Sequence, residues 1–318
     1  MSRKTEVLAR LQQALNPLSG ERIASDLSIS RAAVWKAIEG LRKDGYLIEG
    51  VPNQGYRLSS VQPLLNQSKL FSLLPSYRIE GVDMIDSTNS ELKRRNPRVK
   101  TLLFANTQSG GRGRLGRSFF SPRGGVYFSL ALPLNVSIDS ALLVTSIAAV
   151  ATAEALSEIA HVETSIKWVN DLYLGDKKLC GILTEGIISM ETKTLATVII
   201  GIGINLHLPI DQFPAELQAI ATSAFDSERP LSIDPNRLVQ GIVTNIERLI
   251  EDLPDRSFLE IYRRRSNLIG KTVQVHEGVH SHPARVLGID DDAHLLIADE
   301  TGRTRSLSSG EVSIRLEG

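Results

Sequence analysis

The segment from Ala141 to Ile159 constrains the fold more than any other part of the chain. It is almost entirely apolar, rich in alanine and long enough for several helical turns. A helix that is apolar on nearly every side is a buried helix. We therefore predict that it lies in the core of a large middle domain, which begins near Leu64.

The rest of the composition is that of a soluble chain. Its 318 residues are 42% hydrophobic and 23% charged, which excludes a disordered, collagen-like or membrane-spanning protein and leaves room for two or three domains. Lys and Arg number 36, as do Asp and Glu, so the whole chain exerts no electrostatic pull on nucleic acid or membrane. Cys180 is the single cysteine, and no apolar signal sequence leads the chain. We expect a cytoplasmic protein with no membrane partner.

Three short helices and a hairpin are predicted for the first 60 residues. Apolar residues recur at helical spacing in residues 5–15, 20–27 and 31–44. Ser19 and Ser30 precede the second and third segments, where a serine hydroxyl caps a helix. Residues 46–51 and 56–58, joined by a Pro-Asn-Gln-Gly turn, predict a β-hairpin. Helices joined by a tight turn and followed by a hairpin are typical of a winged helix-turn-helix.

This head is predicted to bind DNA. Nine basic side chains stand against six acidic ones in residues 1–60, a net charge of +3. We expect Arg31 and Lys36 to touch bases or phosphates, and Arg57 to touch phosphate from the wing. The alternative is a small helical bundle that binds protein. A helix-turn-helix, a polar recognition face and a wing found together favour DNA.

Small polar residues follow a strand predicted at residues 82–85. Thr88-Asn89-Ser90-Glu91 fits a capping box that opens a helix from Glu91 to Arg95. Capping alone would account for Ser87 and Thr88. Adjacent donors and acceptors at a strand-to-helix corner also suit a urea or amide ligand, so both interpretations stay open on these residues.

A glycine-rich segment, Gln-Ser-Gly-Gly-Arg-Gly-Arg-Leu-Gly-Arg, follows the strand predicted at residues 101–107. Gly111, Gly113 and Gly116 match the dinucleotide pattern G-x-G-x-x-G, but that pattern must open a helix. Phe-Phe-Ser-Pro at residues 119–122 blocks a helix, so dinucleotide binding is rejected. Glycine amides and arginines both bind carboxylate or phosphate. A mobile surface loop is the alternative.

A second polar cluster follows the strand that begins at residue 165. Lys167, Asn170 and Asp171 crowd its end, and a Gly-Asp hairpin turn places Lys178 beside them. This pattern predicts either an ion pair covered by Trp168 or a site for ATP phosphate and Mg²⁺. The strand predicted at residues 197–206 contains two glycines that leave room for a ligand or a neighbouring backbone, Gly201 and Gly203.

Five motifs, in this order, resemble those of the biotin protein ligases: Asp-Ser-Thr-Asn, Gln-Ser-Gly-Gly-Arg-Gly-Arg, Lys-Trp-x-Asn-Asp, Lys-Leu-x-Gly-Ile-Leu and Gly-Ile-Gly-Ile-Asn. Any one of them would be weak evidence, but five linked motifs are specific. With the winged helix in front, the chain resembles the family of bifunctional biotin protein ligases and biotin-operon repressors. It departs from the family pattern at Val169, where proline is usual, and at Phe119, where tryptophan is common.

The resemblance implies a multidomain α+β protein. Residues 1–62 would form the winged helix-turn-helix, and residues 63–267 an α+β catalytic domain with a mixed or antiparallel sheet. Residues 268–318 would form an SH3-like β-barrel, which fits five short strands separated by Gly and Asp turns. His280-x-His282 in this last part could belong to a metal site, but exposed barrel positions explain it better.

The resemblance also implies roles for the motif residues. Biotin would be bound by Ser87, Thr88, Asn89, Gln108, Arg112, Gly113, Arg114, Lys178, Gly181 and Gly201. ATP and Mg²⁺ would be held by Lys167, Asn170, Asp171 and Asn205, with Asp171 and Asn205 as the metal ligands. The catalytic cations would be Arg112, Arg114 and Lys178, because joining a carboxylate to a phosphate brings anions together.

The implied reaction forms biotinyl-5′-AMP from biotin and ATP, with Mg²⁺ and no permanently bound cofactor. Biotin would then pass to a lysine of biotin carboxyl carrier protein, a subunit of acetyl-CoA carboxylase. The resemblance further implies operator DNA as a partner, repression of biotin biosynthesis genes with biotinyl-5′-AMP as corepressor, and a ligand-promoted homodimer. The strand at residues 198–204 is the candidate dimer edge, although it could equally be an internal strand.

Two alternative functions stay open. One is a DNA-binding regulator that responds to biotin without catalysis, and the other is a lipoate protein ligase on the same fold. The three predicted catalytic cations are all present in the sequence, which argues against a protein that has the ligase fold but no ligase activity. The polar side chains at residues 87, 88 and 108 favour a urea-bearing ring over the apolar dithiolane of lipoate.

Overall fold

The computed structural model describes residues 3–14, 16–43, 46, 48–58, 64–134, 136–137, 140–189, 194–226, 229, 231–277, 280–308 and 311–314. The chain divides into two compact units, Met1–Asn66 and Gln67–Gly318, and each is described by itself. The expected linker at residues 59–63 lies outside the described residues, as do Leu15, Asp44, Gly45, Leu47 and the end of the last expected strand.

The first unit has the expected three helices and hairpin. Helices α1 (Arg3–Gln13), α2 (Gly20–Leu27) and α3 (Arg31–Lys43) precede strands β1 (Ile48–Val51) and β2 (Gly55–Leu58), which pair antiparallel. Both serine caps are confirmed: Ser19 Oγ accepts from the Arg22 amide at 3.1 Å, and Ser30 Oγ from the Ala33 amide at 3.2 Å. One buried face of each helix forms the core, which includes Val7, Leu11, Ile23, Val34, Ile38 and Leu41.

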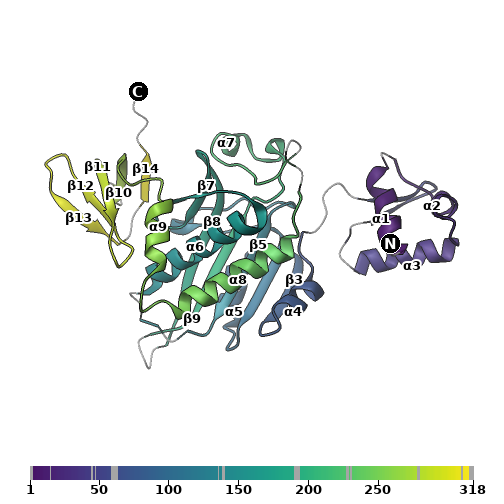
Figure 1. Ribbon diagram of the computed structural model, residues 1–318, viewed down its shortest axis with the longest axis horizontal. Coiled ribbons are helices and arrows are strands. Elements are labelled where there is room, and N and C mark those ends of the chain that lie inside the picture. Colours follow the sequence, from purple (N-terminus) through teal and green to yellow (C-terminus); the bar gives the residue numbers. More distant parts are fainter. Residues whose placement is uncertain are drawn as a thin grey trace. The chain divides into compact units, whose positions relative to one another are not determined.

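The second unit is built on a seven-stranded sheet in the order β3-β4-β5-β9-β8-β7-β6 (Figure 1). Its strands are β3 (Arg78–Ile85), β4 (Thr101–Gln108), β5 (Val126–Leu132), β6 (Ser165–Lys167), β7 (Asp171–Leu174), β8 (Lys177–Ser189) and β9 (Thr194–Ile204). Only β3 and β4 pair parallel, so the sheet is mixed as expected. The prediction that residues 198–204 form a dimer edge is wrong. Strand β9 is the internal strand of the other alternative, because it pairs with β5 on one side and with β8 on the other.

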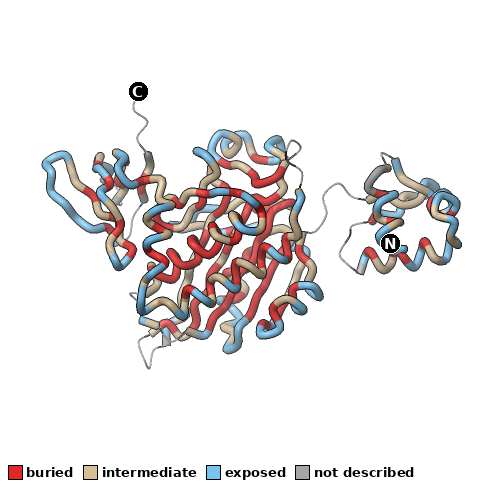
Figure 2. Tube along the Cα trace, in the orientation of Figure 1, coloured by how far each residue is buried: buried red, intermediate tan, exposed pale blue. Residues whose placement is uncertain are grey.

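Helix α6 (Ala141–Ala160) packs on β6, β7 and β8 and on α8 (Pro235–Glu251), while α4 (Gln67–Leu73) contacts α8 and β3, and α9 (Phe258–Arg265) contacts α6 and β6. The central strands β5 and β9 and helix α6 are among the most continuously buried parts of the unit (Figure 2). By length and hydropathy α6 alone among the described helices could cross a membrane, yet 72% of that window is buried inside the unit. This helix is therefore the buried core helix that its composition predicts.

The start of helix α5 (Thr88–Arg95) differs from the prediction. Its N-cap is Ser87, whose hydroxyl accepts from the Ser90 amide, so the helix begins before the expected Glu91. Glu91 does not complete a capping box and instead pairs with Arg94 and Arg95. The helix packs on the sheet through Leu92, which lies in a cluster with Leu103, Ala131 and Ile199.

The C-terminal residues form a separate five-stranded antiparallel sheet in the order β13-β12-β11-β10-β14. The strands are β10 (Thr272–Glu277), β11 (His280–Ile289), β12 (Leu295–Ala298), β13 (Thr304–Leu307) and β14 (Glu311–Ile314). A tight turn between β11 and β12 contacts the neighbouring helix, since Arg263 donates to the Ile289 carbonyl at 2.8 Å and pairs with Asp291 at 2.6 Å.

Candidate functional site

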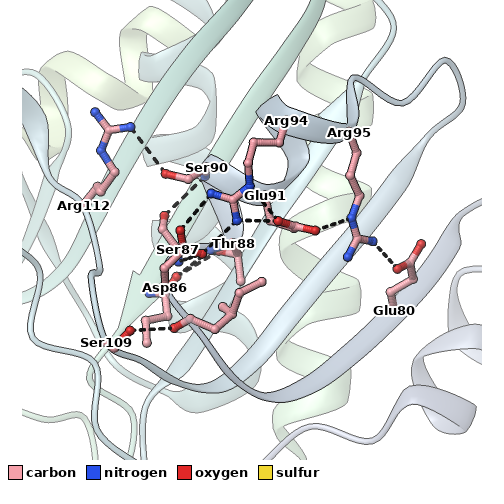
Figure 3. A network of polar contacts seen from close by, with 12 residues as sticks. Glu80, Asp86, Ser87, Thr88, Ser90, Glu91, Arg94, Arg95, Ser109 and Arg112 are labelled. Carbon is pink, nitrogen blue, oxygen red and sulfur yellow. Dashed lines mark hydrogen bonds and ion pairs between the residues drawn. The ribbon is translucent and has the colours of Figure 1, made fainter.

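The strand-to-helix corner between β3 and α5 is held by a polar network (Figure 3). Asp86 accepts from the Ser87 amide at 2.7 Å and forms a two-pronged ion pair with Arg94 at 2.8 and 3.0 Å. Hydrogen bonds from the Arg94 guanidinium and the Ser87 amide lower the pKa of Asp86 to about 2. The Asp86 carbonyl accepts from Gly110 at 2.8 Å, which ties this corner to the start of the glycine-rich loop.

Three side chains at this corner are buried although they are polar. Ser87, Thr88 and Asn89 are each less than 5% exposed. Gln108 Oε1 accepts from the Thr88 amide at 2.9 Å and from the Thr88 hydroxyl at 3.1 Å, while its Nε2 donates to Ser121 at 3.0 Å. The end of β4 and the start of α5 therefore form one hydrogen-bonded wall.

This wall lines a small pocket, which we call the polar pocket. It combines polar side chains with two aromatic rings and several glycines: Ser87, Thr88, Asn89, Gln108, Arg112, Phe119, Phe128, Gly181, Leu183, Gly201, Ile202 and Gly203. The strand glycines leave room for side chains rather than for backbone. A Cβ on Gly201 would lie 2.2 Å from Asn89 Oδ1, and one on Gly203 would lie 2.6 Å from the Phe119 ring.

The glycine-rich loop has an irregular backbone that is held by its own hydrogen bonds, and it does not form an α-helix. Gly113 donates to the Arg117 carbonyl at 2.7 Å and Phe119 to the Gly111 carbonyl at 2.8 Å. Residues Arg114–Gly116 make a single 3₁₀ turn in which Leu115 has a left-handed backbone and is 74% exposed. This geometry agrees with the rejection of a dinucleotide fingerprint.

A larger cavity of about 470 Å³, the cationic pocket, adjoins the polar pocket, with which it shares Arg112, Phe119 and Gly181. Five cationic side chains and one carboxylate line it: Arg112, Arg114, Arg117, Lys167, Lys178 and Asp171. Asn170, Asn205 and Gly113 line it as well. Such a surplus of positive charge attracts an anionic ligand.

Lys178 and Asp171 face each other across the β7–β8 hairpin, with Nζ and Oδ2 2.7 Å apart. Lys178 also lies over the Phe119 ring at 5.8 Å, and Lys167 over the Tyr173 ring at 5.6 Å. Asn170 Nδ2 donates to the Ile182 carbonyl at 2.6 Å, which anchors the end of β6 to β8. The expected proximity of Lys178 to this polar cluster is confirmed.

Every residue predicted for the biotin and ATP sites therefore lines one of two adjoining pockets.

In the first unit, Arg31, Lys36 and Arg57 are all exposed. Arg31 lines a groove between α3 and the hairpin, together with Trp35, Asn53 and Tyr56. Lys36 and Arg57 lie outside the lining of that groove.

Several functional positions were missed by sequence reasoning. Ser129 lies in the apolar strand β5 and joins Thr88 and Asn89 at 2.7 and 2.6 Å. Glu185 on β8 accepts from Asn89 and Lys93. The segment at residues 213–221, which includes α7 (Ala215–Gln218), walls the cationic pocket with Phe213, Leu217, Ile220 and Ala221. No motif marks any of these positions.

Two features bear on what chemistry the site can perform. Burial raises the pKa of the Cys180 thiol, so this cysteine stays protonated and inaccessible. Within the described residues, no group of three His, Cys, Asp or Glu side chains is placed to hold a metal ion. The site thus offers preorganised cations and hydrogen-bonding groups for anions.

Comparisons with known proteins agree with this architecture. Residues 81–205 match the biotin/lipoate A/B protein ligase family, and residues 3–57 match a helix-turn-helix (HTH) domain. The biotin protein ligase from Aquifex aeolicus, solved in complex with biotin and ATP, is similar with a TM-score of 0.63 and 29% identity, covering 75% of this chain and 98% of that one. Fold and site define a ligase of the biotin/lipoate class behind a helix-turn-helix domain.

Two curated relatives narrow the class further. The bifunctional ligase/repressor BirA of Bacillus spizizenii is 35% identical over 296 residues, covering 90% of each chain. The protein of that name from Escherichia coli is 30% identical over 303 residues, covering 93% of this chain and 92% of the relative. The chain belongs to the family of bifunctional biotin ligase/repressors.

Proposed function

We propose that the two adjoining pockets bind biotin and ATP side by side and form biotinyl-5′-AMP between them. The chain is an ATP-dependent biotin protein ligase and a DNA-binding repressor, as its family is. The observation that carries the site assignment is the shared lining of the two pockets by Arg112 and Gly181. A molecule in the polar pocket can thereby present its carboxylate to the cationic pocket.

The residues of the two pockets fall into groups according to the part of the ligand that each would bind. Ser87, Thr88, Asn89 and Gln108 supply hydrogen bonds for the ureido ring, and Gly181 and Gly201 belong to the floor beneath it. Arg112, Gly113 and Arg114 close over biotin and adenylate. Lys167, Asn170 and Asn205 serve ATP in the cationic pocket.

The first step joins one biotin carboxylate oxygen to the α-phosphorus of ATP and releases pyrophosphate. Two anions approach each other, so preorganised cations aimed at the reacting oxygens lower the barrier. Arg112, Arg114 and Lys178 are the cations we assign to this task. The Asp171 carboxylate holds Lys178 Nζ at 2.7 Å and so fixes where that charge lies.

A magnesium ion fits the same residues. Asp171 Oδ1 is buried and has no hydrogen-bond partner among the described residues, while Asp171 Oδ2 contacts Lys178. A carboxylate oxygen of this kind suits Mg²⁺, which binds proteins through one or two carboxylates and takes its other ligands from phosphate and water. Asp171 and Asn205 would hold the ion, which would neutralise phosphate charge when bound.

The second step transfers biotin to a lysine of the biotin carboxyl carrier protein. The ε-amine attacks the carbonyl carbon of the mixed anhydride, the amide bond forms, and AMP leaves with the electrons of the broken C–O bond. The buried Cys180 is not available as a nucleophile, in keeping with direct transfer. Water exclusion by the glycine-rich loop would protect the anhydride until the acceptor arrives.

The remaining assignments are proposals on the same footing. The winged helix-turn-helix would span residues 1–62, the catalytic domain residues 63–267 and the C-terminal domain residues 268–318, with the last as an SH3-like barrel. Its five short antiparallel strands support that choice. The repressor would bind operator DNA through Arg31, Lys36 and Arg57, act as a ligand-promoted homodimer with biotinyl-5′-AMP as corepressor, and work in the cytoplasm.

One experiment tests the ligase assignment against both alternatives. The protein is incubated with ATP, Mg²⁺ and either biotin or lipoate, and pyrophosphate release is followed. We expect release with biotin and little with lipoate. Release with lipoate alone would make the chain a lipoate ligase, and binding of biotin without any release would make it a non-catalytic regulator.

A further inference from the structure

We infer that Glu185 is a positioning residue for biotin: it fixes the orientation of the Asn89 amide and thereby commits the hydroxyl of Thr88 to act as a hydrogen-bond acceptor. The inference rests on the proposed assignment of the polar pocket to biotin. Glu185 itself lies outside the lining of both pockets, so it acts through other side chains.

Glu185 lies on β8 against α5, and only 15% of its side chain is exposed. Its Oε2 accepts from Asn89 Nδ2 at 3.1 Å, and its Oε1 accepts from Lys93 Nζ at 3.0 Å. Burial opposes its ionisation, but the hydrogen bonds from Lys93 and Asn89 outweigh burial, and the pKa of Glu185 lies below its ordinary value. The group is therefore a carboxylate at neutral pH and can only accept hydrogen bonds.

This carboxylate determines which way the Asn89 amide faces. Asn89 Nδ2 donates to the Leu183 carbonyl at 3.1 Å as well as to Glu185, and neither of these partners can donate in return. The reversed amide would set its oxygen against a carboxylate and a carbonyl, in a side chain that is only 4% exposed. Asn89 Oδ1 must therefore point toward Ser129, in the space that Gly201 leaves open.

The orientation of Asn89 then determines where two hydroxyl protons go. Ser129 is fully buried, and its Oγ lies 2.6 Å from Asn89 Oδ1 and 2.7 Å from Thr88 Oγ1. A serine hydroxyl has one proton, and Asn89 Oδ1 can only accept, so Ser129 donates to Asn89. The Thr88 hydroxyl must donate to Ser129 or to Gln108 Oε1, which already accepts the Thr88 amide.

Thr88 therefore offers only lone pairs to a bound ligand. A hydroxyl that accepts but cannot donate selects a ligand N–H over a carbonyl at the same position, because a mismatched buried polar pair is costly. The ureido ring carries two N–H groups, so this polarity suits biotin. The fixed negative charge of Glu185 thus sets which groups donate and which accept along the hydrogen-bonded chain of Asn89, Ser129 and Thr88.

The test uses Glu185→Gln, which preserves the shape of the side chain. Lys93 attracts the oxygen of the introduced amide, so its NH₂ group faces Asn89 Nδ2 and favours reversal of the Asn89 amide against the hydrogen bond to the Leu183 carbonyl. We expect the Kd for biotin, measured by calorimetry without ATP, to rise about tenfold or more, since one buried mismatch costs about 1.4 kcal/mol or more. The KM for biotin should rise with it, while kcat at saturating biotin changes little.

Lys93→Met is the matched control, because it removes the 3.0 Å ion pair at Glu185 and keeps both the bond to Asn89 and the longer 3.9 Å ion pair with Arg112. We expect a Kd for biotin within about threefold of the wild-type value. In the double variant Glu185→Gln/Lys93→Met, the 3.0 Å contact that holds the introduced oxygen away from Asn89 is gone, and only the longer 3.9 Å approach of Arg112 is left on that side within the described residues. Biotin affinity should therefore recover toward that of Lys93→Met, which a merely structural role of Glu185 would not produce.

Two results would overturn the inference: a wild-type Kd for Glu185→Gln, or a double variant that binds biotin no better than Glu185→Gln. If Glu185→Gln does not fold, as judged by thermal unfolding, Glu185→Asp gives the same test. It keeps the charge but withdraws it from Asn89, so a wild-type Kd would again contradict the role. If the wild-type protein binds no biotin, the proposed function itself fails, and that outcome is distinct from these.

Discussion

At the scale of single residues, Lys178 is the side chain whose removal should separate chemistry from binding. It lines the cationic pocket and not the polar pocket. Lys178→Ala should leave the Kd for biotin nearly unchanged and slow adenylate formation roughly a hundredfold or more, as expected when one charge-stabilising donor is lost. Single-turnover release of pyrophosphate at saturating biotin measures this, with the exposed Lys271→Ala as control. An unchanged rate would remove Lys178 from the mechanism.

Asp86 gives a second residue-scale prediction, which concerns pH. Its pKa of about 2 lies below the roughly 3.9 of a free aspartate. Because the folded pKa is the lower one, ionised Asp86 contributes stability above pH ~4, and that contribution is lost as the pH falls from about 4 toward 2. Arg94→Gln should raise the pKa of Asp86 toward its ordinary value, as a carboxyl-carbon NMR titration would measure. The exposed Arg98→Gln should leave the titration curve where it was, and an unmoved curve in Arg94→Gln would contradict the assigned cause.

The corner residues could be predicted from the sequence because small polar side chains stand out where an apolar strand ends. Ser129 and Glu185 could not. A serine inside Val-Tyr-Phe-Ser-Leu-Ala-Leu is unremarkable in a core strand, and a glutamate on a long strand suggests a solvated face. Their partners lie 40 and 96 residues away along the chain. Only the pairing of β5, β8 and β9 brings them together, and no local pattern encodes that pairing.

At the scale of elements, most local signals predicted their helices and turns correctly, although the capping box at residues 88–91 does not form. The sequence did not determine the order of the strands. Periodicity and caps predicted α2, α3 and the wing, because those signals arise within a few neighbouring residues. An apolar run such as β9 has the same composition at the edge of a sheet as in its interior, so the sequence left both open. The structure places it between β5 and β8, and β3 and β6 are the edges of that sheet. A dimer built by edge pairing of that sheet must use one of those two strands.

The turn between β11 and β12 supports an element-scale prediction. Trp168 lines the cationic pocket, and its Nε1 donates to the Ala293 carbonyl at 2.9 Å, a buried bond between the pocket wall and the C-terminal sheet. Trp168→Phe keeps an aromatic ring but leaves that carbonyl unpaired, at a cost of about 1–3 kcal/mol. We expect the KM for ATP to rise several-fold while the Kd for biotin stays near the wild-type value.

Trp35→Phe is the matched control for that substitution, because Trp35 is 60% exposed on α3 of the first unit. It should change neither constant. A Trp168→Phe protein with wild-type KM for ATP would show that the turn holds the C-terminal sheet in place without shaping the pocket.

At the scale of the whole molecule, the charge of the first unit limits how the repressor can work. A net charge of +3 over residues 1–60 supplies few phosphate contacts, so one winged helix should bind an operator weakly, and two heads on one DNA are needed for useful affinity. We expect the glycine-rich loop to become ordered around biotinyl-5′-AMP, which would lower the entropic cost of association and couple the adenylate to the dimer. Sedimentation and operator titrations at fixed salt should then show the dimer and the tight complex with biotin plus ATP, and neither without ligand.

Arg31→Ala should weaken operator binding in every ligand state while pyrophosphate release stays at the wild-type rate, because the two activities lie in separate units. Equal dimerisation and equal DNA affinity with no ligand, with biotin alone and with biotin plus ATP would exclude the adenylate as corepressor and leave the ligase assignment intact.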